Sequence, residues 1–161
     1  MYKFNWTAEI VGYSLAVVGV LVAFVQGFLI RKIIPRLGQV KSIYLGMSFS
    51  ALGLLLFGLA SESWMMFAFL IPYCLGGIAG PSIQGVISSQ VPANEQGELQ
   101  GALTSLMSLC GVFGPLLMTN LFAFATAKNS TFHVPGAPFF LASCLTLVSF
   151  YLSYRTLSKK H

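Results

Sequence analysis

Residues 76–101, "GGIAGPSIQGVISSQVPANEQGELQG", decide the fold of this 161-residue chain, because they interrupt an otherwise apolar sequence. The stretch holds six glycines, two prolines and four glutamines, and long apolar runs flank it on both sides. Glycine and proline end or bend helices, and polar residues gather where membrane helices end. We therefore interpret the stretch as the end of one membrane-spanning helix, a polar turn, and the start of the next.

The composition supports this interpretation, since hydrophobic residues make up 56% of the chain and charged residues only 8%. The mean hydropathy is +0.80. A soluble domain of this size needs more charge on its surface. Asp, Glu, Lys and Arg are absent from four long blocks, residues 42–61, 63–94, 99–127 and 129–154. Blocks of this length indicate membrane spans.

The apolar runs predict an all-α integral membrane protein with five transmembrane helices in one domain, residues 1–161. Each run approaches the roughly 20 residues that a helix needs to cross about 30 Å of hydrocarbon. None alternates with a period of two, which excludes the strands of a membrane barrel. The predicted spans are about 10–30, 42–60, 64–88, 99–125 and 138–154.

Seven of the nine basic residues lie in two clusters, the inter-span loop at 31–41 and the tail at 155–161. Positive charge marks cytoplasmic segments, so we expect the N-terminus outside and the C-terminus in the cytoplasm. The same clustering argues against nucleic-acid binding as the role of the net charge of +5. An odd number of spans with an outside N-terminus also suggests that a preceding helix is missing and that Met1 is an internal methionine.

Small residues four apart and prolines inside the spans have two interpretations. Small faces let helix backbones pack closely, and prolines bend helices. In a transporter the same features let helices slide or rock. The residues expected to serve packing and bending are Gly76, Gly77, Gly80, Pro81, Gly97, Gly101, Gly114 and Pro115.

Polar side chains inside spans are the candidate substrate contacts, because each needs a partner in a dry medium. Gln26, Ser50, Tyr73 and Gln84 are the candidates, and the alternative is that they bond or pack between helices. We find no ionisable side chain deep in a span, so a proton carrier is not expected here. The sequence has no catalytic motif, metal-ligand pattern or cofactor loop, and we expect neither an enzyme nor a metal or cofactor site.

Eight matches in order and spacing point to one family. They are FNW at 4–6, VGYSLA at 11–16, Gln26, RLG at 36–38, SESW at 61–64, GGIAGPSIQGV at 76–86, QGELQGALTSL at 96–106 and GVFGPLL at 111–117. Together they resemble the C-terminal half of the major facilitator superfamily, specifically its tetracycline/proton antiporter group of drug exporters. The five spans would then be helices eight to twelve of twelve. The resemblance implies a bacterial inner membrane, and a missing N-terminal half as partner.

The loop at 31–41 resembles a family motif that stabilises the outward-open state, with Arg31, Arg36 and Gly38 as its functional residues. Its charges also suffice to set topology, and both roles are compatible. Two departures concern the family's substrate and proton handling. Val22 stands where the tetracycline exporters have a histidine, and Ser50 stands near the position of an acidic residue.

The leading functional prediction is the C-terminal part of a secondary transporter for small molecules, with tetracycline-like drug efflux driven by proton antiport. Its mechanism would be alternating access of two halves around a midplane site in the lipid bilayer. Two alternatives stay open. The chain is a truncated or orphan fragment that only packs with a partner, or it belongs to a facilitator-family transporter of another small solute.

Overall fold

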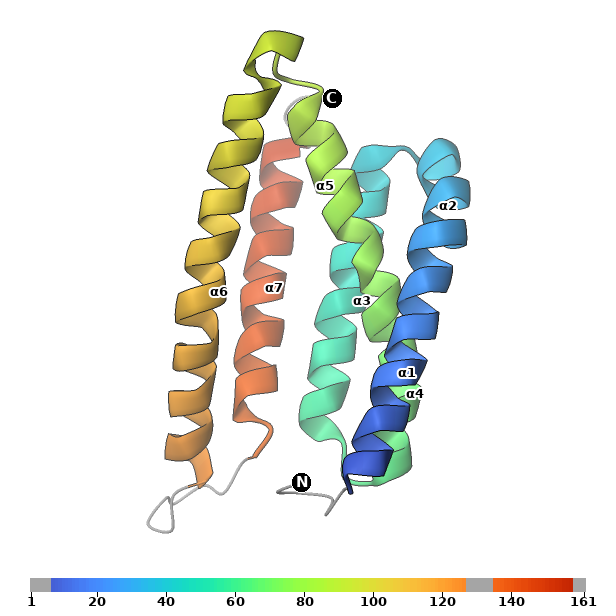
Figure 1. The fold of residues 1–161 in the computed structure, drawn as a ribbon, viewed down its shortest axis with the longest axis vertical. Coiled ribbons are helices and arrows are strands. Elements are labelled where there is room, and N and C mark those ends of the chain that lie inside the picture. The colour runs from blue at the N-terminus through green and yellow to red at the C-terminus, as the bar shows by residue number, and fades with distance from the viewer. Residues whose placement is uncertain (1–6, 127–134, 158–161) are drawn as a thin grey trace.

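The computed structural model describes residues 7–126 and 135–157, in which every regular element is helical. Five helical stretches there are long and apolar enough to cross a membrane, and Figure 1 shows them side by side in one bundle. The predicted all-α membrane fold with five such helices is confirmed. The FNW stretch and the tail lysines lie outside the described residues. The five stretches are Ala8–Leu37, Gln39–Leu59, Ser63–Ser88, Ala93–Thr126 and Ala137–Leu157.

The first stretch consists of α1 (Ala8–Phe24), a π-helical turn η1 (Val25–Leu29) and α2 (Ile30–Leu37). Thr7 caps its start, since the threonine hydroxyl oxygen accepts a hydrogen bond from the Ile10 amide at 3.4 Å. Gly38 ends α2 with φ 79° and ψ 163°, a conformation that only glycine adopts readily. The chain therefore turns at Gly38 into the next helix, α3 (Gln39–Leu59).

The core of the bundle lies along α3, which contacts α4 (Ser63–Leu75), α5 (Ala79–Ser88) and α7 (Ala137–Leu157). Two glycines of α3 make this contact close. A Cβ added to Gly46 would lie 2.5 Å from the Ala79 nitrogen, and one added to Gly53 would lie 2.7 Å from the Tyr73 Cα. Lipid provides no hydrophobic driving force for helix association. Van der Waals contact between closely packed backbones therefore supplies the attraction.

The pairing of α3 with α7 also has a polar component. The Ser143 hydroxyl is buried and donates a hydrogen bond to the Ala51 carbonyl oxygen at 2.9 Å. The Tyr44 ring lies 5.7 Å from the Phe150 ring, centroid to centroid. Hydrogen bonds between membrane helices contribute about 0.6 kcal/mol each on average. The serine therefore helps to set the register of α7 on α3, while packing supplies most of the attraction.

The stretch at 76–101 does separate two membrane-length helices. A 3₁₀ turn, η2 (Gly76–Ile78), joins α4 to α5, and a second one, η3 (Ala93–Glu95), precedes α6 (Gln96–Thr126). Helix α6 continues unbroken through Pro115. Within residues 76–101, the helix breaks are therefore η2 and the turn before α6.

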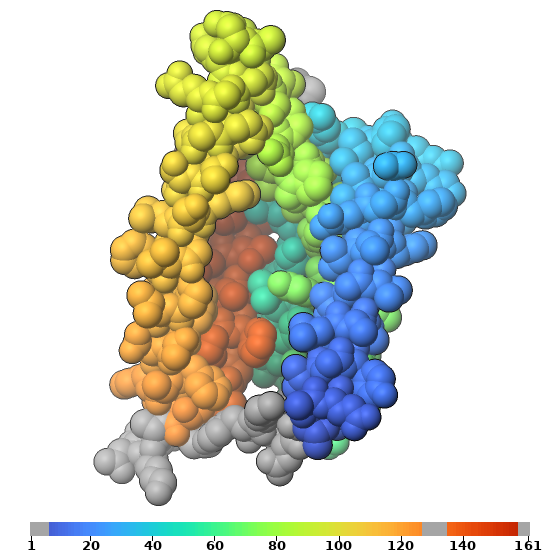
Figure 2. Space-filling model, in the orientation of Figure 1, coloured from blue at the N-terminus to red at the C-terminus, as the bar shows by residue number. Residues whose placement is uncertain are grey.

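The outer helices α1 and α6 are poorly covered by the rest of the described chain. Helix α1 has no buried residue, and α6 has only Ala125. Figure 2 shows the face between these two helices hollowed, with α7 visible behind. In Figure 1 the α2–α3 junction, the α5–α6 turn and the end of α7 share one end of the bundle. Residues 31–41, which were predicted as a loop, are helical except at Gly38. They lie with Arg155 at this same end.

Candidate functional site

Gln26 lies in the π-helical turn η1, an irregularity that the sequence analysis did not predict. The Ile30 amide donates to the carbonyl oxygen of Val25, five residues earlier, so the turn is one residue wider than an α-helical turn. The Gln26 side chain is exposed, and within the described residues its amide makes no hydrogen bond. Single π turns inside α-helices occur often at functional sites. The turn therefore presents a free amide donor and acceptor.

The second irregular turn, η2, contacts η1. It lies between Pro72 and Pro81, neither of which has a backbone N–H to donate. Departures from α geometry and missing donors both leave carbonyl oxygens outside the regular ladder of hydrogen bonds. Such carbonyls, beside a free amide, are able to accept hydrogen bonds from a polar solute.

Ser50 and Tyr73 lie on the helices next to η2, and both take part in packing. A Cβ added to Gly76 would overlap the Ser50 side chain, so the serine fills the space that the glycine leaves. Tyr73 is 42% exposed, and its ring lies 5.5 Å from the ring of the buried Phe57. The structure thus brings Ser50 and Gly76 together beside η1. Contact of Ser50 or Tyr73 with a substrate stays a prediction.

Gln84 lies nearer the end of the bundle that holds the α5–α6 turn, and its partner is another amide. Its Nε2 donates a hydrogen bond to Oε1 of Gln100 on α6 at 3.0 Å. One helical turn earlier, Gln96 Nε2 donates to the carbonyl oxygens of Ser88 and Val91, at 2.7 and 2.8 Å. The sequence analysis missed Gln96 and Gln100. Their spacing of four residues, which places both on one face of a helix, was the available signal.

The remaining predicted packing residues divide into two groups. Gly76 has a close neighbour, as described above. A Cβ at each of the other five predicted glycines would meet nothing within 4 Å. These positions face open space within the described chain, so close packing there stays a prediction. The five are Gly77, Gly80, Gly97, Gly101 and Gly114.

The predicted gating residues lie on α2 and at its end. Arg31 and Arg36 are exposed, and neither forms an ion pair with another described residue. Gly38 makes the turn into α3, and its carbonyl oxygen accepts a hydrogen bond from the Ser42 hydroxyl at 2.7 Å. The positive φ explains why glycine stands at this position. A gating role for the two arginines stays a prediction.

Within the described ranges, no three His, Cys, Asp or Glu side chains lie together in a way that would hold a metal ion. The polar groups at η1 and η2 are the uncharged Gln26 amide, the Ser50 hydroxyl and backbone carbonyls. The arrangement is suited to hydrogen bonding a solute inside the membrane.

A bundle of membrane-length helices with polar groups at its helix breaks defines a polytopic membrane protein with the features of a solute transporter. Comparison with known families identifies the family to which it belongs. The chain belongs to the Major Facilitator Superfamily, whose family model matches residues 1–161.

Two similar proteins are tetracycline resistance proteins, which confirms the predicted likeness to that group. The class C protein of Escherichia coli is 39% identical over 144 residues, covering 89% of this chain and 36% of the relative. The class G protein of Vibrio anguillarum is 37% identical over 147 residues, covering 91% and 37% respectively.

A more distant relative is Hippocampus abundant transcript-like protein 1 of Mus musculus. It is 27% identical over 168 residues, which cover 91% of this chain and 33% of the relative. The chain therefore spans about a third of the length of the relatives that it matches. No solved structure matches the chain significantly.

Proposed function

We propose that the chain is the C-terminal part of a secondary transporter, and not an enzyme, that exports tetracycline-like drugs in exchange for protons. The observation that carries the proposal is the contact between η1 and η2, which puts the turn that holds Gln26 beside a second helix break. Membership of the superfamily and the tetracycline resistance relatives support the choice of activity. The proposed mechanism is alternating access, with the helix breaks lining the drug's path.

The rest of a longer transporter is the proposed partner. The match to about a third of each relative is one support. The other is α6, whose open glycines Gly97, Gly101 and Gly114 are the kind of surface that a neighbouring membrane helix covers. The proton-carrying group belongs to that missing part, because a proton relay in a membrane uses carboxylates or histidines. The described spans place amides at their breaks instead.

The proposed location is the bacterial inner membrane, with the end of the bundle that holds the α2–α3 junction in the cytoplasm. Arg31, Lys32, Arg36 and Lys41 surround that junction, and Arg155 lies in the last turn of α7 at the same end. Concentrated positive charge close to span ends favours the cytoplasmic side.

A chimera tests the drug-export proposal, with this chain replacing the matched region of the class C tetracycline resistance protein. Tetracycline uptake is measured in everted membrane vesicles, with and without a protonophore. We expect uptake that the protonophore abolishes. Gln26→Ala should lower it about tenfold, the effect of losing one good hydrogen bond to the solute.

Asn120→Ala is the matched control. This amide also lies in a span, but it donates to the Leu116 carbonyl oxygen of its own helix at 2.8 Å. Its loss should change uptake less than twofold. Equal losses in the two variants would contradict the assignment of Gln26. A chimera that inserts without transporting supports the packing-only fragment, and export of dyes but not tetracycline supports another solute.

A further inference from the structure

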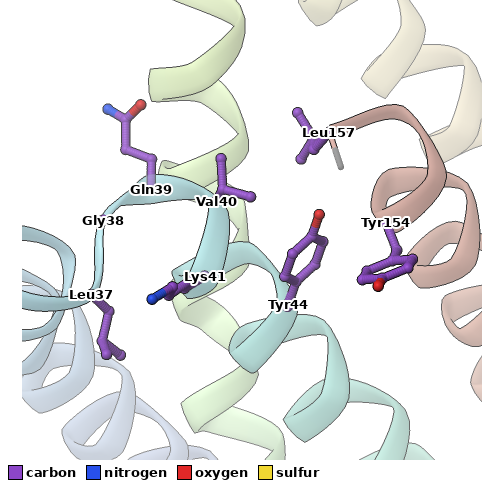
Figure 3. A pocket seen from close by; sticks show the side chains of 8 residues that line it. All are labelled: Leu37, Gly38, Gln39, Val40, Lys41, Tyr44, Tyr154 and Leu157. Carbon is purple, nitrogen blue, oxygen red and sulfur yellow. The ribbon is translucent and has the colours of Figure 1, made fainter. Parts of the chain in front are cut away.

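A cavity of about 730 Å³ opens at the end of the bundle where α2 passes into α3 and α7 ends. Its lining is formed by residues 37–41 and Tyr44 on one side, and by Tyr154 and Leu157 of α7 on the other. Figure 3 shows the side chains of α3 and α7 facing each other across it. This cavity is separate from the helix breaks that form the proposed drug path.

The charge at this cavity is positive. Lys41 lines it, is exposed, and forms no ion pair within the described residues. None of the four carboxylates of the chain is among its lining residues. An amine without a counter-ion, at a span end where lipid headgroups lie, attracts an anion.

Apart from Gly38 and the polar Gln39, the remainder of the lining is apolar or aromatic. Leu37, Val40 and Leu157 supply aliphatic surface, and the rings of Tyr44 and Tyr154 lie 5.6 Å apart. Aromatic side chains with a polar end are suited to the boundary between headgroups and hydrocarbon. A ligand that fits this lining has a charged end beside Lys41 and an apolar part beside α7.

The Tyr44 hydroxyl adds a specific polar contact. It is buried and has no hydrogen-bond partner, a state that costs free energy unless an acceptor is supplied. Figure 3 shows the hydroxyl directed between Val40 and Leu157. Because the hydroxyl is enclosed in this arrangement, a phosphate oxygen in the cavity reaches it only if a neighbouring side chain or the end of α7 moves aside.

We propose that this cavity binds the phosphate of an anionic glycerophospholipid, with Lys41 pairing the charge and Tyr44 donating a hydrogen bond. The acyl chains lie along the apolar side chains of α3 and α7. The proposal does not depend on drug export, since none of these residues takes part in the proposed drug path.

Native mass spectrometry of the full chain in detergent tests the site, with phosphatidylglycerol and phosphatidylcholine as probes. We expect one phosphatidylglycerol to bind at least several-fold more tightly than phosphatidylcholine. Lys41→Gln should weaken the binding of phosphatidylglycerol about fivefold, the effect expected of one basic residue beside an anionic lipid. Lys41→Arg should retain binding, and Tyr44→Phe, which keeps the charge, should weaken binding about threefold.

Lys32→Gln is the matched control, because it removes the same charge from a residue that rests over the Phe28 ring, 5.4 Å from its centroid, and does not line the cavity. It should change binding less than twofold. Equal losses for Lys32→Gln and Lys41→Gln, or equal binding of the two lipids, would overturn the proposal. Displacement of the lipid by millimolar inorganic phosphate would also overturn it, by assigning the cavity to soluble anions.

Discussion

The Gln84 side-chain amide on α5 donates a hydrogen bond to the side-chain oxygen Oε1 of Gln100 on α6, with 3.0 Å between nitrogen and oxygen. Gln96, which is also on α6, donates hydrogen bonds from its side-chain amide to the backbone carbonyl oxygens of Ser88 and Val91. Helix α6 is otherwise nearly without buried residues. These amides are therefore the specific polar links that hold the start of α6 against α5 in the described chain.

The first prediction concerns the Gln84–Gln100 bridge. In a double-mutant cycle of Gln84→Ala and Gln100→Ala, we expect a coupling of about 0.6 kcal/mol in the free energy of unfolding, the average for such bonds in membrane proteins. Unfolding in mixed micelles containing sodium dodecyl sulfate, followed by circular dichroism, measures it. The pair Gln84→Ala with Asn120→Ala is the control and should be additive. Additivity in both cycles would mean that the bridge contributes nothing.

The second prediction concerns the close approach of α3 and α5 at Gly46. A Cβ there would lie 2.5 Å from the Ala79 nitrogen, so Gly46→Ala should lower the free energy of unfolding by about 1–3 kcal/mol through overpacking. Gly12→Ala is the matched control, because a Cβ at Gly12 would meet nothing within 4 Å. It should be neutral or stabilise by up to about 1 kcal/mol through helix propensity. The same unfolding assay compares them, and equal effects would argue against the contact.

The third prediction concerns the backbone at Gly38. Its φ of 79° and ψ of 163° lie in a region that is essentially restricted to glycine. Gly38→Ala should therefore cost about 1–3 kcal/mol in the free energy of unfolding. Gly38→Asn should not rescue it, since asparagine tolerates the left-handed helical region but not this one. Rescue by asparagine would show that the turn has left-handed helical geometry instead.

The fourth prediction concerns orientation in the membrane. In a variant with the three cysteines replaced by serine, single cysteines are introduced at two exposed positions. Gln39→Cys lies at the start of α3, and Glu62→Cys lies in the turn between α3 and α4. A membrane-impermeant maleimide added to intact cells should label Glu62→Cys at once. It should label Gln39→Cys only after the membrane is permeabilised. The reverse pattern would invert the proposed topology.

Several features were predictable because a residue's type alone decides them. The five membrane-length helices follow from the long uncharged runs, and the helix breaks follow from glycine and proline in residues 76–101. Gln26 and Gln84 stood out because amides are rare in apolar spans. The π turn around Gln26 was not predictable, since a turn of this kind depends on packing around it and has no distinctive residue pattern.

The amino-acid sequence by itself determined that this chain crosses a membrane as helices and which family it belongs to. Long apolar runs are more stable out of water. In lipid their backbone N–H and C=O groups must form hydrogen bonds within the protein, which favours helices. Only the tertiary structure decided which small residues touch another helix. Gly46 and Gly53 are in close contact while Gly97 and Gly101 are open. Because α3 and α6 are apolar around most of their circumference, hydropathy does not specify their rotation. Close packing of backbones specifies the rotation of each helix, and this packing exists only once the helices are assembled.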